Sequence, residues 1–99
     1  MTMYVARVEL YDASYENYKA LYKRMAALGY LDAIPSDNGQ FYRLPPGEYF
    51  AEKPKEGGEE ILEQVKSIAA GIVQKYAVVV TAASWVKWNG LEAIEQVAA

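Results

Sequence analysis

The chain has 99 residues, of which 53% are hydrophobic and 23% charged, and this composition indicates one folded domain spanning residues 1–99. It contains no cysteine and no histidine, which excludes a disulfide-linked partner, a thiolate zinc site and hydrolases built on a Ser-His or Cys-His pair. The formal charge of −3 and the pI near 4.9 argue against a protein that binds nucleic acid mainly through phosphates.

The N-terminal third predicts a strand followed by a helix. Residues 3–11 alternate between apolar and polar side chains, a pattern typical of a half-buried strand. Ser14 stands where a helix N-cap is expected, and Gly29 where the helix should end. The apolar stripe between them favours burial of its tyrosines in the core over a role in stacking on bases. It comprises Tyr15, Tyr18, Leu21, Tyr22, Met25 and Leu28.

The middle of the chain predicts a hairpin. Residues 30–34 and 40–44 read as strands, and the segment 35–39 between them is rich in turn-forming residues. Pro45 and Pro46 should end the second strand. We expect only a short extended piece over 47–50 and a solvated loop over 52–58.

The C-terminal part predicts a second helix and a last strand. A helical stripe follows Glu59, and residues 76–83 read as a strand whose valines suggest that both faces are covered, in part by a partner. A short helix is expected over 91–97. The order β-α-β-β-α-β predicts an α+β, ferredoxin-like sandwich: an antiparallel sheet with two helices on one face and a short C-terminal extension. With no recognisable signal peptide or membrane span, a cytoplasmic location is expected.

Asp12 is the first candidate functional residue, because it lies between the first strand and the first helix, where ligands gather in α/β layers. One interpretation is that it shares helix capping with Ser14. The other is that it binds a Mg²⁺-like ion or orients a water molecule. A lone carboxylate is a poor metal site, so a second chain or a substrate phosphate would have to complete it.

Basic residues form a second candidate group. Lys19 and Lys23 lie one helical turn apart, with Arg24 on the other flank. A solvated helix face explains them, and the alternative is a phosphate-binding patch that also includes Arg7 and Arg43.

The third candidate is a homodimer interface formed by Val79, Trp85 and Trp88. Tryptophans are too large to stay in water without reason, so each closes the local core or contacts another subunit.

Several segments resemble the GhoS family, whose named member is the endoribonuclease antitoxin of type V toxin–antitoxin systems. The resemblance rests on residues 4–15, 27–30, 36–45, 48–49, 76–81 and 88–91. That family is similar in fold to small CRISPR-associated ferredoxin-like proteins, some of them metal-dependent nucleases, whose first strand ends in an aspartate as here at Asp12. The resemblance implies cleavage of a toxin messenger RNA. It assigns to Lys23 and Arg24 the place of the family's helix arginine.

Two functions follow as hypotheses. The first is an antitoxin-like, homodimeric RNA-binding protein or endoribonuclease, with Asp12, Lys23 and Arg24 as catalytic residues, Mg²⁺ as the candidate cofactor, and Arg7, Lys19 and Arg43 holding RNA. The second is a non-catalytic protein-interaction module, phage- or plasmid-borne, that uses its sheet face and its tryptophan segment.

Overall fold

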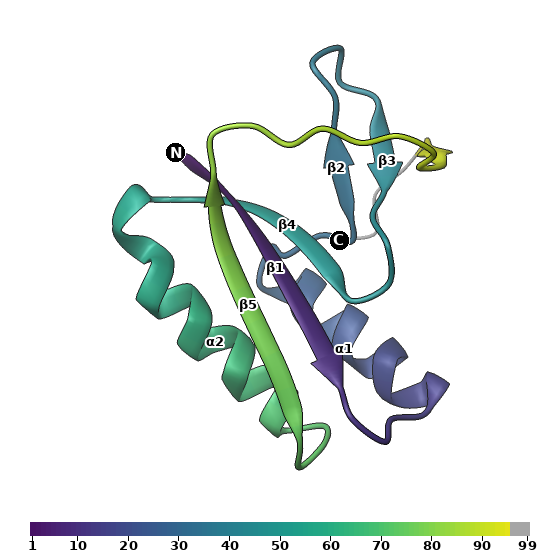
Figure 1. Cartoon of the computed structure of the whole chain (residues 1–99), viewed down its shortest axis with the longest axis vertical. Coiled ribbons are helices and arrows are strands. Elements are labelled where there is room, and N and C mark those ends of the chain that lie inside the picture. The colour runs from purple at the N-terminus through teal and green to yellow at the C-terminus, as the bar shows by residue number, and fades with distance from the viewer. Residues whose placement is uncertain (96–99) are drawn as a thin grey trace.

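The computed structural model describes residues 1–95 and contains two α-helices and two three-stranded antiparallel sheets (Figure 1). In chain order the elements are β1 (Thr2–Leu10), α1 (Tyr15–Ala27), β2 (Ala33–Pro35), β3 (Phe41–Arg43), β4 (Glu48–Lys53), the 3-10 turn η1 (Lys55–Gly57), α2 (Gly58–Ala70), β5 (Tyr76–Ala83) and β6 (Ala93–Ile94).

The larger sheet has the order β4-β1-β5, with β1 in the centre. Strand β1 is antiparallel to both neighbours, and Arg7 is the cross-strand partner of Glu48 on one side and of Val79 on the other. The extended piece expected over 47–50 is confirmed from Glu48 on but is longer than expected, because β4 is a six-residue strand that pairs along most of β1. The expected loop over 52–58 is wrong, since it contains the end of β4, the turn η1 and the start of α2.

Both helices contribute to one core with the inner face of the larger sheet. The alternation predicted for β1 is confirmed, with Tyr4, Ala6, Val8 and Leu10 buried. Leu21 and Met25 of α1 are fully buried, as is Val65 of α2. The core residues are Tyr4, Ala6, Val8, Leu10, Leu21, Met25, Tyr30, Tyr49, Ala51, Ile61, Val65 and Ala69.

The ends of α1 are set locally, as predicted. The Ser14 hydroxyl accepts a hydrogen bond from the Asn17 backbone N–H, and the Asn17 side chain accepts one from the Ser14 N–H, which forms a capping box. Gly29 follows the C-cap with a φ of +87°, a conformation that glycine adopts without strain.

The second sheet has the order β2-β3-β6 and lies across one end of the larger sheet (Figure 1). A single bridge between Leu31 and Phe50 connects the segment just before β2 to β4. Phe50 packs beneath this sheet in a small second core with Ile34 and Leu44. The expectation of a single antiparallel sheet is therefore wrong, because the 31–35 strand leaves β4 after one bridge and pairs with β3.

The C-terminal part differs from the expectation at its last element. Residues 93–94 form β6 where a helix was expected, because they pair with β3; residues 96–97 lie outside the described range. Within residues 1–95 the outer face of β5 is uncovered and Val79 is 61% exposed, so the covering of this face by a partner stays a prediction. Within residues 1–95, neither α-helix combines the length and the apolar character that a membrane crossing requires.

Candidate functional site

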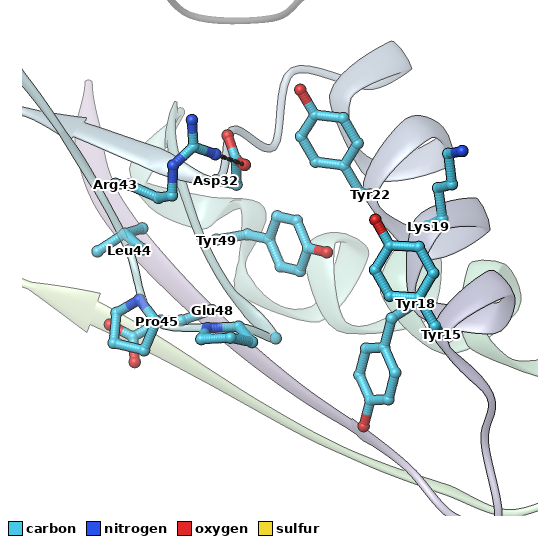
Figure 2. A pocket seen from close by; sticks show the side chains of 12 residues that line it. Tyr15, Tyr18, Lys19, Tyr22, Asp32, Arg43, Leu44, Pro45, Glu48 and Tyr49 are labelled. Carbon is cyan, nitrogen blue, oxygen red and sulfur yellow. Dashed lines mark hydrogen bonds and ion pairs between the residues drawn. The ribbon is translucent and has the colours of Figure 1, made fainter. Parts of the chain in front are cut away.

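A tyrosine-lined pocket lies between α1 and the segment that joins β3 to β4 (Figure 2). Its volume of about 430 Å³ is in the range of small-molecule sites. We call it the tyrosine pocket. It is lined by Tyr15, Tyr18, Lys19, Tyr22, Asp32, Arg43, Leu44, Pro45, Pro46, Gly47, Glu48 and Tyr49.

Helix α1 supplies one wall because three of its tyrosines are spaced by three or four residues and so share one face. Tyr18 is tied to the end of β1, where its hydroxyl accepts a hydrogen bond from the Leu10 backbone N–H at 3.0 Å. Tyr15 is 78% exposed at the rim. The prediction that these tyrosines belong to the core is therefore wrong for Tyr15, and Tyr18 and Tyr22 are only half-buried.

The opposite wall is a proline-rich segment held against β1 by Gly47. The Gly47 carbonyl accepts a hydrogen bond from the Val8 N–H at 2.7 Å. Gly47 has a φ of +84°, and a Cβ atom there would lie 2.6 Å from the Val8 carbonyl oxygen. Only glycine fits this close approach, which positions Pro45 and Pro46 across from α1.

Tyr49 occupies the floor of the pocket. It lies between the Asp32–Arg43 pair and α1, with its hydroxyl directed toward α1 (Figure 2). The residue is only 4% exposed, yet its hydroxyl has no hydrogen-bond partner within residues 1–95. Burial raises the pKa of this phenol, and the Asp32 carboxylate and the phenols of Tyr18 and Tyr22 raise it further. The described residues contain no buried side-chain oxygen or nitrogen without a partner, so this unpartnered hydroxyl is accessible, and a neutral donor faces the pocket.

Charged side chains line the pocket on two sides. The Arg43 guanidinium donates to the Asp32 carboxylate at 3.1 Å, while Lys19 lies on α1. Glu48 also lines the pocket, and its carboxylate is 3.6 Å from the Arg7 guanidinium. The pocket therefore combines aromatic surface, an accessible hydroxyl and charges of both signs.

The structure brings together only part of the predicted RNA-binding set. Lys19 and Arg43 line the same pocket, whereas Arg7 lies on the outer face of β1 and reaches the site only through Glu48. Lys23 is exposed on α1 outside the pocket lining. Arg24 donates to the Gly71 carbonyl at 3.4 Å, a contact that helps to cap α2.

Asp12 is exposed in the turn before α1, with a left-handed backbone (φ 53°). The capping role is carried by Ser14 and Asn17, and no backbone N–H of the cap donates to the Asp12 carboxylate. The described part of the chain contains no group of three or more His, Cys, Asp or Glu residues placed to bind a metal ion, so Asp12 alone does not make a Mg²⁺ site. Arg24 lies roughly 13 Å further along α1, at 1.5 Å per residue from Tyr15, too far for direct contact with Asp12.

The predicted interface residues occupy different surroundings. Val79 and Trp85 are 61% and 68% exposed, respectively. Trp88 packs against the second core, where its ring lies 5.5 Å from that of Tyr42. Trp88 thus closes a core within the chain, while Val79 and Trp85 remain open to a partner.

Sequence reasoning missed two residues of the pocket, Asp32 and Tyr49. They come from separate segments that meet only in the folded chain, so no spacing connects them. The run Pro45-Pro46-Gly47 just before Tyr49 was the available signal, because two prolines and a glycine mark a fixed backbone next to an aromatic residue.

Comparison of the chain with protein-family models, with curated proteins and with solved structures finds no match. The chemistry of the pocket is therefore the basis for assigning a role. Tyrosine rings and prolines offer flat apolar contact to a planar group, and Lys19 and Arg43 offer charge to an anion nearby.

Proposed function

We propose that the protein binds single-stranded RNA and holds an unpaired base in the tyrosine pocket. The observation that carries this proposal is the presence of two cations, Lys19 and Arg43, in one pocket with four tyrosines. Single-stranded RNA is recognised by stacking its splayed bases on aromatic rings while cations contact its phosphates. This proposal agrees with the antitoxin-like role that the resemblance implies, and it places the protein in the cytoplasm with its RNA.

The charge balance fits a binding mode in which stacking dominates. The chain carries a net charge of −3, so long-range attraction to phosphate is weak. Tyr15 stands exposed at the rim and makes no side-chain hydrogen bond within residues 1–95, so its ring is available to a base. Base stacking on an aromatic ring contributes about 1–3 kcal/mol, enough to support binding with few phosphate contacts.

The test is the affinity for a fluorescently labelled uridine heptamer, measured by anisotropy at several salt concentrations. Tyr15→Ala should weaken binding by about fivefold or more, whereas Tyr15→Phe should retain it because the ring remains. Lys19→Ala should weaken binding and lower the salt dependence by about 0.7 in log–log slope, the value for one phosphate contact on a single strand.

Lys66→Ala is the matched control, because it removes the same charge from α2, away from the pocket. An equal loss in Lys19→Ala and Lys66→Ala would show that only net charge matters. Failure of the native protein to bind this heptamer or any heptamer with another central base would contradict the proposal.

The endoribonuclease activity implied by the resemblance is a further proposal, with Asp12, Lys23 and Arg24 as its residues. Its direct test is cleavage of a partly structured RNA, with Mg²⁺ and with EDTA. Asp12→Asn is the sharpest variant, since asparagine tolerates the left-handed backbone and removes only the charge. Cleavage that survives in Asp12→Asn would contradict a role for this carboxylate.

A second candidate function, self-association, is favoured by the edge of the larger sheet. Within residues 1–95, β5 pairs only with β1, and its eight residues contain no charge and no proline to discourage further pairing. We propose that β5 pairs with β5 of a second copy in antiparallel orientation, with Val79 and Trp85 in the contact.

Sedimentation equilibrium tests this dimer. Val79→Lys should give a monomer, while Val79→Thr should leave the dimer intact because threonine keeps the strand preference without a charge. A native protein that is monomeric at high concentration would contradict the proposed dimer.

The ferredoxin-like topology also belongs among the proposals. The order β5-β1-β4, extended by the Leu31–Phe50 bridge, matches the strand order of a β-α-β-β-α-β sandwich. On this view, the strand after α1 is paired only at its first residue, and the rest of it belongs to the second sheet.

A further inference from the structure

The tyrosine pocket contains hydrogen-bonding groups that stacking alone does not use. The Tyr49 residue is 4% exposed, and its hydroxyl has no partner in the described chain although it faces the pocket (Figure 2). The hydroxyl is accessible from the pocket, since no side-chain oxygen or nitrogen of the described residues is both buried and unpartnered, so a bound ligand can accept a hydrogen bond from it. Asp32 lines the same pocket, and its carboxylate contributes to the raised pKa of the Tyr49 phenol.

The Asp32 carboxylate has capacity left for a ligand. One of its oxygens accepts from Arg43 at 3.1 Å, and no other hydrogen bond to Asp32 side-chain oxygens is present in residues 1–95. An ionised carboxylate has about four lone-pair sites on its two oxygens. Arg43 thus orients the carboxylate through one lone pair of one oxygen and leaves the other oxygen, together with the second lone pair of the first, for a ligand with two donors.

We propose that the tyrosine pocket selects guanine. This inference rests on the proposed RNA binding and names the base that the pocket accepts. The Watson–Crick edge of guanine presents two adjacent N–H donors, on N1 and N2, beside one acceptor, O6. The Asp32 carboxylate accepts from the two donors and the Tyr49 hydroxyl donates to O6, while the α1 tyrosines and the prolines contact the faces of the base.

The other bases match this pair of groups less well. Adenine and cytosine each offer one amino group beside a ring nitrogen whose lone pair would face the carboxylate. Uracil offers one N–H between two carbonyl oxygens, which an anion repels. Because hydrogen bonds to an ionised acceptor are about twice as strong as neutral ones, the second donor of guanine should dominate the selection.

The experiment compares uridine heptamers that carry guanine, adenine, cytosine or inosine at the central position with the all-uridine heptamer. Anisotropy should show the guanine heptamer binding about tenfold or more tightly than the all-uridine heptamer. Inosine, which retains O6 and N1–H but lacks the N2 amino group, should fall between them. The native protein is used throughout as the reference.

Variants test which side chains are responsible for the preference for guanine. Asp32→Asn should collapse the ratio of guanine to uridine affinities, because an amide offers only one acceptor atom and loses the charge. Tyr49→Phe should reduce the preference for guanine and for inosine alike, since both lose the contact to O6. Asp37→Asn removes a carboxylate from outside the tyrosine pocket and should keep the ratio.

The outcomes separate this inference from the proposed function. Heptamers that bind equally well, and lose affinity in Tyr15→Ala, would overturn guanine selection and support RNA binding. A preference that persists in Asp32→Asn would also overturn it. If no heptamer binds, the result contradicts both the proposed RNA binding and the proposed selection of guanine.

Discussion

At the scale of single residues, Gly47 holds the tyrosine pocket in shape. Its left-handed backbone and its approach to the Val8 carbonyl both require the absence of a side chain. Gly47→Ala should lower the free energy of unfolding by more than about 2 kcal/mol, because strain in the left-handed region adds to a backbone clash. Urea denaturation measures the loss.

Gly39 provides the matched control. It has nearly the same φ, +87°, but nothing lies within 4 Å of the position of a Cβ atom. Gly39→Ala should therefore cost only about 1–2 kcal/mol, the backbone term alone. Equal losses at the two positions would show that the close contact at Gly47 does not matter.

The Tyr49 hydroxyl gives a second prediction at the residue scale. Because it has no hydrogen-bond partner in the described chain, Tyr49→Phe should leave the free energy of unfolding within about 0.5 kcal/mol of the native value. Tyr4→Phe should instead cost about 1–2 kcal/mol, since the Tyr4 hydroxyl donates to the Lys55 carbonyl at 2.6 Å. A large loss in Tyr49→Phe would mean that its hydroxyl has a partner in the free protein.

At the scale of elements, α1 must begin at a fixed residue for its tyrosines to face the pocket. The capping box sets that start. Ser14→Ala should cost about 1 kcal/mol, because it removes the acceptor for the Asn17 N–H. Ser67→Ala on the exposed side of α2 is the control and should be neutral within about 0.5 kcal/mol. Thermal unfolding followed by circular dichroism compares the two variants, and equal values would contradict the role of the cap.

The elements also show what the sequence could predict. Strand β1 and both long helices were predicted from periodicity, because each buries one face against a single core, whereas β5 was predicted from its run of valines. Only the start of β4 was predicted, because the strand is covered on both sides: Tyr49 and Ala51 face the helices while Phe50 lies under the second sheet. Three successive buried residues show no alternation. The hairpin of the second sheet was predicted from its turn residues and is confirmed as β2 paired with β3. Strand β6 was missed because two residues carry almost no periodic signal.

The pocket was half predictable for a related reason. Lys19 and Arg43 were recognised as cations, since charge is visible in a sequence. The burial of Tyr49 and its closeness to Asp32 arise from the packing of β4 against α1 and the 31–35 segment, which no local pattern records.

At the scale of the whole molecule, the buried tyrosines predict how stability depends on pH. Burial raises the pKa of Tyr49 above its usual value of 10.0, and burial together with Glu60 raises that of Tyr30. Above pH 10 the unfolded chain therefore loses protons that the folded chain retains. The stabilising contribution of these phenols is complete below pH 10, and it is lost as the pH rises beyond that value.

Urea denaturation at pH 9 to pH 11.5 measures this decline. Tyr49→Phe should make it shallower, since that variant has one fewer phenol to ionise. Tyr15→Phe, at a position that is 78% exposed, should leave the slope as it is in the native protein. Identical slopes in all three proteins would contradict the assignment to Tyr49.

The position of β1 in its sheet has a consequence for synthesis. This strand is synthesised before both of its neighbours, which are residues 48–53 and 76–83. Strand β1 must therefore wait, unpaired and half apolar, until β5 has emerged from the ribosome. Its folding is set by late, long-range contacts and not by local ones. A translational pause between α2 and β5 would lengthen that exposure, so the nascent chain is most vulnerable to aggregation or to a protease just before its last long strand is made.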